Sequence, residues 1–141
     1  ASRLVAHDLA QKLMRVDKEC HLYDDWHDQL LCAKNMHEGD MAIAFSYSGL
    51  TQEVLDCTVE AQRHNCPVVA VTKVDGSSKL ATMADAVLGV AASEPLVRRG
   101  AMASRMAQLM VVDALYAAYV ASDYERATHV IKQNYIEKQE R

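Results

Sequence analysis

A turn rich in hydroxyl groups lies near the middle of the chain, directly after the apolar residues 41–45. Ser46, Ser48 and Thr51 carry the hydroxyls, and Gly49 lets the backbone approach a ligand closely. We expect a buried parallel strand to end just before this turn and an amphipathic helix to begin just after it. The free amide N–H groups of a first helical turn, together with the helix dipole, favour a bound anion. The pattern therefore predicts a phosphate-binding loop.

An ordinary helix N-cap with surplus serines is the alternative interpretation of this turn, and it stays open. The turn holds no lysine or arginine, so positive charge must come from the helix dipole, the amides or residues elsewhere. The Gly-Lys-Ser of a Walker loop and the Gly-x-Gly-x-x-Gly of a dinucleotide-binding fold are both absent, so neither nucleotide class is supported. We expect no cofactor.

The composition is that of one compact domain. The chain has 141 residues, half of them hydrophobic, which is enough for a sizeable core. A formal net charge of −4 without a basic stripe argues against a nucleic-acid-binding surface. The apolar runs are too short to cross a bilayer and no signal-peptide pattern is visible, so we expect a cytoplasmic protein without a membrane partner. The four cysteines lack Cys-x-x-Cys spacing and are expected as reduced core thiols.

Helical and strand patterns alternate along the chain. We expect helices over residues 2–15, 24–36, 51–65, 102–121 and 124–138, and strands over residues 19–23, 41–45, 68–72 and 86–90. Val59 is expected on the inward face of the third of these helices. The alternation predicts an α/β fold, a doubly wound parallel sheet with helices on both faces. Because such domains normally begin with a central strand, we also expect at least one strand before Ala1.

Three separated segments make the sequence similar to a known family. The predicted phosphate-binding turn has the sequence Ser46-Tyr47-Ser48-Gly49-x-Thr51-x-Glu53. This sequence resembles the Ser-x-Ser-Gly-x-Thr-x-Glu signature of sugar isomerase (SIS) domains. Residues 2–15 and 100–116 resemble the corresponding helices of SIS domains in RpiR-type transcription regulators. The resemblance implies that residues 1–141 form a single phosphosugar-binding SIS domain. It also implies a helix-turn-helix domain upstream, through which alone the protein contacts operator DNA, with the phosphosugar as effector.

The resemblance also carries site residues over by position. It assigns the phosphate to Ser46, Ser48 and Thr51, in agreement with the physical interpretation of the turn. Tyr47 stands where the isomerases often have glutamine, and its backbone amide can still serve. The resemblance further implies a contribution from Ser2 in the first strand-to-helix turn, with a plain N-cap role as the alternative.

Catalysis is a separate question. Isomerising SIS domains have a catalytic glutamate five residues before the serine that matches Ser104, and Arg99 occupies that position here. Arginine cannot act as the general base of an aldose–ketose shift at neutral pH. Glu94 lies nearby and is a candidate replacement, although a carboxylate in such a loop is more often a sugar-hydroxyl ligand or a helix-start charge. Arg98 and Arg99 just before a helix are either solvated or meet an anionic ligand or a partner subunit.

These residues predict an effector-sensing domain without catalytic residues, and a phosphosugar isomerase or lyase is the alternative. A dimerisation domain whose loop binds only inorganic phosphate or sulfate is a third, plainer interpretation. The resemblance to regulators of amino-sugar catabolism favours an N-acetylated amino-sugar 6-phosphate as the effector. The sequence itself does not identify the sugar.

His27 is the histidine best placed for a ligand. It should lie in the loop after the predicted strand 19–23, at the sheet edge where open α/β sheets bind ligands. We take it as a candidate for a sugar-hydroxyl or phosphate contact, with an exposed loop histidine as the alternative. Cys20 and His21 together with His27 match no recognised metal-site spacing, so no metal is expected.

The helix over residues 102–121 is apolar on almost every face. A helix apolar all round must be buried on all sides, whereas the sheet can cover only one of them. We therefore predict a homodimer in which this helix packs near the symmetry axis. Deep burial within a single domain is the alternative.

Overall fold

The computed structural model of the chain describes residues 2–91 and 101–137. Its strands are β1 (Ala42–Phe45), β2 (Val68–Lys73) and β3 (Ala86–Val90). Its helices are α1 (Ser2–Met14), α2 (Trp26–Lys34), α3 (Gln52–Arg63), α4 (Lys79–Met83), α5 (Met102–Ser122) and α6 (Tyr124–Gln133). The predicted alternation of helices and strands is confirmed.

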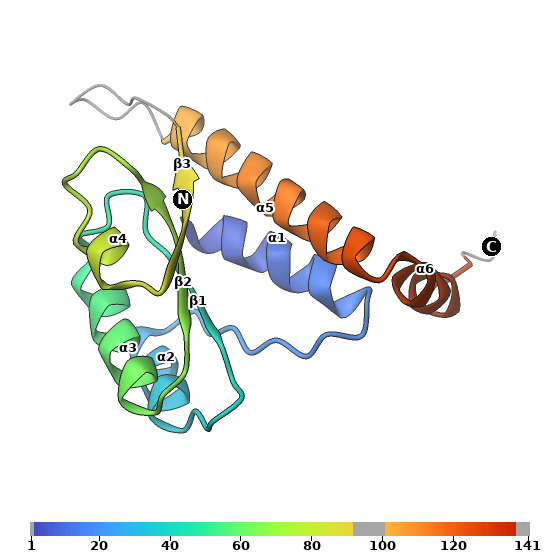
Figure 1. Ribbon diagram of the computed structural model, residues 1–141, viewed down its shortest axis with the longest axis horizontal. Coiled ribbons are helices and arrows are strands. Elements are labelled where there is room, and N and C mark those ends of the chain that lie inside the picture. Colours follow the sequence, from blue (N-terminus) through green and yellow to red (C-terminus); the bar gives the residue numbers. More distant parts are fainter. Residues whose placement is uncertain (1, 92–100, 138–141) are drawn as a thin grey trace.

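The three described strands form one parallel sheet in the order β1-β2-β3. The register pairs Phe45 with Val71 and Val71 with Leu88, so the carboxyl ends of the strands lie together at one edge. Helices α3 and α4 cover one face of the sheet, with α2 packed against α3, and α1 and α5 cover the other face (Figure 1). The arrangement confirms the predicted α/β sandwich with helices on both faces.

Each face of the sheet has its own core. On one side Val5 and Leu9 of α1 pack with Val112 of α5 against the partly buried Ile43 and Phe45. On the other side two clusters lie under α3 and α4, one formed by Leu55, Ala70 and Leu80 and the other by Ala61, Cys66 and Val68. Strand residues that are buried on both faces explain why β2 is a continuous apolar run rather than an alternating one.

The predicted strand over residues 19–23 is wrong. This segment forms no strand, and its residues are exposed apart from the partly buried Leu22. A strand requires a hydrogen-bonded neighbour. A groove of about 1530 Å³ is lined both by this segment and by β1, so the segment runs beside the groove without reaching the sheet.

Smaller predictions also need correction. Val59 is 36% exposed rather than buried, and α6 ends at Gln133 rather than near residue 138. Of the four cysteines only Cys66 is buried, while Cys20 is exposed and Cys32 and Cys57 are half-buried, so they are not all core residues. All four are free thiols, as predicted. Burial raises the pKa of the Cys57 thiol to about 11, which keeps it protonated at neutral pH.

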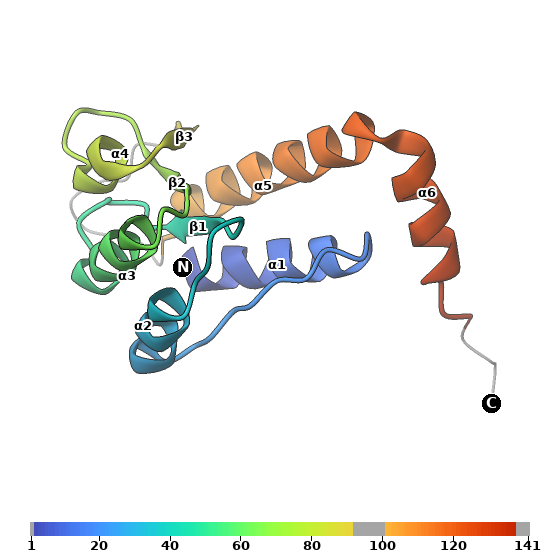
Figure 2. The ribbon, with the colours of Figure 1, turned by 60° about the horizontal axis from the view of Figure 1, so that its bottom comes forward.

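Helices α1 and α5 lie side by side and project beyond the sheet, and α6 turns away from the end of α5 (Figure 2). Helix α5 buries Ser104, Gln108 and Val112, whereas the methionines of its opposite side are exposed. Deep burial of the whole helix within the domain therefore does not occur. None of the helices in the described ranges is long and apolar enough to span a membrane.

Candidate functional site

The hydroxyl-rich turn follows β1 directly and is held together by its own side chains. The Ser46 Oγ and Thr51 Oγ1 atoms lie 2.8 Å apart within hydrogen-bond distance, and the Gly49 amide donates to Ser46 Oγ at 3.1 Å. The Leu50 amide donates to Ser48 Oγ at 3.3 Å. Ser46 is only 3% exposed, whereas Thr51 is exposed and Ser48 is half-buried. Ser46 therefore braces the loop from within, whereas Ser48 and Thr51 lie nearer to its surface.

Gly49 is required by both its backbone and its surroundings. Its φ of +68° lies in the left-handed region, which side chains disfavour. A Cβ atom at this position would lie 1.8 Å from the Ser78 Oγ atom, and the Gly49 carbonyl accepts a hydrogen bond from the Leu80 amide at 3.0 Å. The turn is thus packed without a gap against the segment that follows β2.

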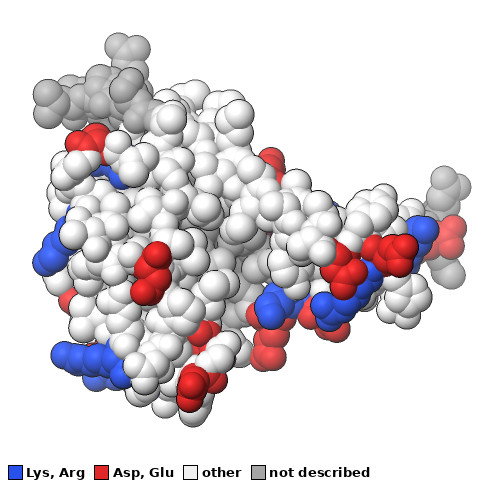
Figure 3. Space-filling view, in the orientation of Figure 1, with Lys and Arg blue, Asp and Glu red and all other residues white. Residues whose placement is uncertain are grey.

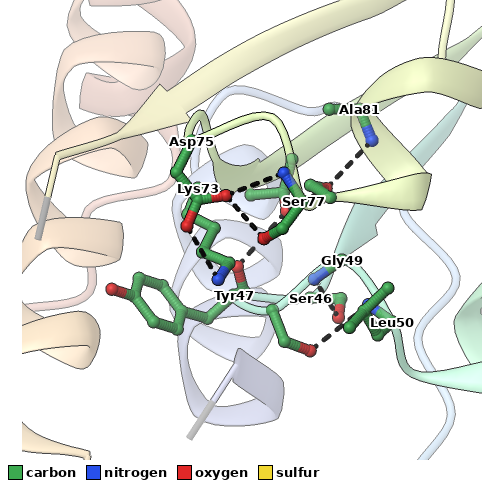
Figure 4. A network of polar contacts seen from close by, with 11 residues as sticks. Ser46, Tyr47, Gly49, Leu50, Lys73, Asp75, Ser77 and Ala81 are labelled. Atoms are coloured by element: carbon green, nitrogen blue, oxygen red, sulfur yellow. Dashed lines mark hydrogen bonds and ion pairs between the residues drawn. The ribbon is translucent and has the colours of Figure 1, made fainter. Parts of the chain in front are cut away.

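That second segment contains supporting residues which the sequence analysis did not assign to the site. The Ser78 Oγ atom lies 2.8 Å from the Thr72 Oγ1 atom and accepts a hydrogen bond from the Ala81 amide at 3.1 Å, which caps α4. Figure 4 shows the two segments side by side. No sequence pattern indicated Ser78 as a packing partner for Gly49, since a serine in a polar loop is typical of a turn or a helix cap.

Thr51 occupies the N-cap position of α3, but its side chain makes no capping hydrogen bond. The first-turn amides of Gln52 and Glu53 likewise have no acceptor within the described residues. Uncapped amides at the start of a helix carry a partial positive charge and bind anions readily. The simple N-cap interpretation of the turn explains these contacts less well than an anion site, because a capping residue would satisfy one of these amides.

Lys73 is a cationic residue next to the loop, and its backbone amide donates to the Tyr47 carbonyl at 3.1 Å. The Lys73 Nζ atom forms an ion pair of 2.9 Å with Asp75. Hydrogen bonds from Ser77 and from Lys73 hold the pKa of the Asp75 carboxyl well below its usual range. Lys73 therefore already has a carboxylate partner, and the amides and the dipole of α3 are a further source of positive potential beside the loop.

The predicted site residues are brought together only in part. Ser2 is the first residue of α1 and lines the same large groove as Ser46, Tyr47, Ser48 and Thr51. His27 lies in the first turn of α2, where its amide donates to Asp25 Oδ1 at 2.8 Å, and its side chain is exposed. It does not line the groove, although its neighbours Trp26 and Asp28 do. Glu94, Arg98 and Arg99 lie outside the described residues.

Ser104 is a groove residue that the sequence analysis did not include. It lies in the first turn of α5, is 1% exposed and donates a hydrogen bond to the Ala101 carbonyl at 3.2 Å. It lines the groove together with Ser2 and the hydroxyl-rich turn. A serine in the first turn of the predicted helix 102–121 was the available signal. In the part of the chain that the structure describes, no group of three or more histidine, cysteine or acidic side chains could hold a metal ion.

A parallel sheet with helices on both faces and a hydroxyl-lined turn at the carboxyl end of a strand defines an open α/β domain, a class that binds ligands at this edge of the sheet. The SIS domain model matches residues 1–118, and the chain belongs to the SIS domain family. This family membership was predicted from the turn and from the two flanking helices, and it is confirmed.

Relatives of the chain are HTH-type transcriptional regulators. It is 40% identical over 124 residues to an uncharacterised HTH-type transcriptional regulator of Caldanaerobacter subterraneus subsp. tengcongensis, covering 88% of this chain and 44% of the relative. The chain thus spans about half the length of the curated relative that it matches.

Two solved structures are similar in fold. The Vibrio vulnificus NanR protein in complex with ManNAc-6P has a TM-score of 0.86 and 30% identity, covering 94% of this chain and 49% of that protein. The sugar isomerase domain of an RpiR transcription factor from Sphaerobacter thermophilus has a TM-score of 0.78 and 23% identity. This match covers 93% of this chain and 71% of that protein.

Proposed function

We propose that this chain is the effector-sensing domain of a transcription regulator and binds a phosphosugar at the turn 46–51. The observation that carries the proposal is the uncapped start of α3, where the amides of Gln52 and Glu53 follow directly on Thr51 and the hydroxyl-rich turn. A phosphate group supplies acceptors for all of these donors at once. The free sugar lacks this charge and should bind weakly.

The comparisons narrow the class of ligand. NanR, which is 30% identical to this chain, was solved in complex with ManNAc-6P. An N-acetylated amino-sugar 6-phosphate is therefore our preferred effector, and it agrees with the preference drawn from the sequence. The hydroxyl-bearing groove residues outside the phosphate turn, Ser2 and Ser104, are the side chains that we assign to the remainder of the ligand.

Regulation follows if the two conformations of the whole protein bind the phosphosugar unequally. A ligand with equal affinity for both conformations shifts no equilibrium, so the effector must change how this domain packs against its neighbours. We propose that a helix-turn-helix domain upstream of Ala1 transmits this change to operator DNA in the cytoplasm. Arg99 at the position of the catalytic glutamate supports binding without turnover, whereas an isomerase or lyase would require another base such as Glu94.

The test is calorimetric titration with N-acetylmannosamine 6-phosphate, with unphosphorylated N-acetylmannosamine and with inorganic phosphate. Ser48→Ala removes one hydrogen bond to a charged group, worth roughly 1.5–3 kcal/mol, and should weaken binding by about 10- to 100-fold. Ser122→Ala, which alters an exposed serine at the far end of α5, is the matched control and should bind as the parent does.

Three results would contradict the proposal. Equal binding of the sugar and its phosphate would mean that the turn does not recognise a phosphate group. Binding of inorganic phosphate alone would favour the plainer interpretation, a dimerisation domain that binds only inorganic phosphate or sulfate. Conversion of the phosphosugar to a product, lost in Glu94→Gln, would make the domain an enzyme. Other sugar phosphates in the same titration would distinguish a wrong sugar from a wrong site.

A further inference from the structure

Lys73 is the last residue of β2, and its backbone is tied to the hydroxyl-rich turn 46–51. The Lys73 amide and the Thr72 Oγ1 atom both donate to the Tyr47 carbonyl, at 3.1 Å and 3.3 Å. Further along the same two loops, Gly49 is packed against Ser78 without room for a Cβ atom. The turn and the loop after β2 are therefore joined at two points, and the Lys73 side chain starts from a fixed position next to the turn.

The Lys73 amine stays close to these loops instead of extending into water. The side chain is 25% exposed, and its Nζ atom lies 2.9 Å from Asp75 Oδ2. In Figure 4 Lys73 lies between Asp75 and Tyr47. Ordering the four-carbon stem of a lysine costs side-chain entropy. The Asp75 carboxylate is the group that holds the amine beside the turn.

Asp75 does not depend on Lys73 for its hydrogen bonds. Its Oδ1 atom accepts from the Ser77 amide at 3.0 Å and from the Ser77 Oγ atom at 2.6 Å. The carboxylate is thus anchored within its own loop and keeps two donors when Lys73 turns away. An ammonium group has three N–H donors, so Lys73 is able to take another acceptor. The ion pair is therefore one in which the cation is free to move and the anion is not.

A bound phosphate monoester would bring close to two negative charges to a turn that holds no lysine or arginine. The start of a helix supplies only about half a positive charge. In the view of Figure 3 few charged side chains gather over the loops at the carboxyl edge of the sheet, on the face that it presents. A cation beside the turn that is able to change its acceptor would improve the charge balance of the bound state.

We propose that Lys73 is a ligand-binding residue of the phosphosugar site and exchanges its ion pair with Asp75 for one with the bound phosphate. The inference rests on the proposed function of the turn 46–51. Asp75 then acts in the free protein, where it keeps the amine in place and competes with the ligand for it. Because a dianion gains more from a lysine than a monoanion does, Lys73 also favours a sugar phosphate over a sugar sulfate of the same shape.

Calorimetric titration with N-acetylmannosamine 6-phosphate and with the corresponding 6-sulfate tests this role. Lys73→Met removes the charge and should weaken binding of the phosphate by roughly 10- to 100-fold, and binding of the sulfate by less. Asp75→Asn removes the competing carboxylate, while its amide oxygen still accepts from Ser77, and should strengthen binding several-fold. Lys34→Met is the matched control, because it removes the same charge from an exposed lysine in the last turn of α2. It should bind as the parent does.

Lys73→Arg keeps the charge and should retain part of the affinity, which separates a lost charge from a damaged fold. A parent chain that binds no sugar phosphate would overturn the proposed function and the role of Lys73 with it. A parent chain that binds the phosphate, together with a Lys73→Met variant that binds it equally well, would overturn the role of Lys73 alone. Equal weakening in Lys73→Met and Asp75→Asn, with an unchanged preference for phosphate over sulfate, would also overturn it, because the ion pair would then only support the loop.

Discussion

Helices α3 and α5 cover opposite faces of one sheet and leave different parts of themselves exposed. Helix α3 buries Leu55, Thr58 and Ala61 and leaves polar amides uncovered at its N-terminal end. Helix α5 buries Ser104, Gln108 and Val112 and leaves a long apolar side uncovered. A helix end offers a few directional and partly charged groups, whereas a helix side offers a wide area of weak contacts. The first fits a small anion and the second fits a large surface.

The two helices also differ in how well their sequences indicate which side faces inward. In α3 the apolar side and the buried side nearly coincide. In α5 a glutamine is fully buried while three methionines are exposed, and the Oε1 atom of Gln108 has no hydrogen-bond partner within the described ranges. A helix that is apolar all round has no preferred inward side in its sequence, so the orientation of α5 is set by its neighbours α1, β2 and β3.

The largest expected effect comes from a substitution in the turn that precedes α3. Gly49→Ala must hold a left-handed backbone and also displace Ser78, because the new Cβ would lie 1.8 Å from its Oγ atom. We expect a loss of more than about 3 kcal/mol in unfolding free energy and no detectable phosphosugar binding. Urea unfolding and calorimetry measure the two effects.

Gly76→Ala is the control for this prediction. Gly76 has a φ of +82°, but nothing lies within 4 Å of the added Cβ, so only the backbone cost of about 1–2 kcal/mol applies. Equal losses in the two variants would mean that the contact between Gly49 and Ser78 is unimportant for the loop.

An intermediate effect separates the two sides of α5. Val112 is fully buried, and Val112→Ala should lower the unfolding free energy by about 2 kcal/mol. Met110→Ala, at a position 74% exposed, should cost less than about 0.5 kcal/mol at concentrations where the chain is monomeric. Urea unfolding at low protein concentration gives both values. A loss as large in Met110→Ala as in Val112→Ala would mean that the exposed side of α5 has been assigned wrongly.

The smallest effect tests the link between the two layers of helices. Asp24, just before α2, lies 2.8 Å from the His7 Nε2 atom and 3.6 Å from the Arg3 Nε atom of α1. The hydrogen bond with His7 and the charge of Arg3 lower the pKa of the Asp24 carboxyl below its usual 3.8. Its contribution is therefore present above about pH 4 and lost as the pH falls through the lowered pKa.

Asp24→Asn should lower the melting temperature slightly at neutral pH, and the difference from the parent should disappear in acid. Thermal melts from about pH 7 down to pH 2 measure it. A difference that grows in acid would mean that the carboxylate does not stabilise the link, since the linkage between protonation and folding would then have the opposite sign.

Most of the fold followed from local sequence patterns. The apolar runs predicted the ends of β2 and β3 to within one residue. The Asp25 side chain caps α2 where the sequence predicted that this helix begins. The segment 19–23 was misjudged because its pattern of apolar residues satisfies a strand while pairing depends on a neighbour that the pattern does not reveal. Val59 was misjudged because a position at the border of an amphipathic face is decided by packing.

The site was predictable where one short segment contains it. Ser46, Ser48 and Thr51 are close in sequence, and the transition from strand to helix fixes their geometry. Thr72 and Ser78 could not be assigned, because their contact with the turn depends on how two separate loops pack against each other. Ser104 reaches the groove from the far end of the chain, so no local pattern could connect it with the others.

The hydrogen bonds inside the turn form a short chain that runs from a buried amide to the exposed residue Thr51. The buried Gly49 amide donates to the Ser46 hydroxyl, and that hydroxyl lies 2.8 Å from Thr51. When the Ser46 hydroxyl donates to the Thr51 Oγ1 atom, the Thr51 hydroxyl hydrogen is free to bond an oxygen atom of a ligand. Each hydrogen bond in this series polarises the next. The acidity of the hydroxyl that a ligand meets is then adjusted by two groups that the ligand never touches. The buried Gly49 N–H thereby influences ligand recognition through two successive hydrogen bonds, without contacting the ligand itself.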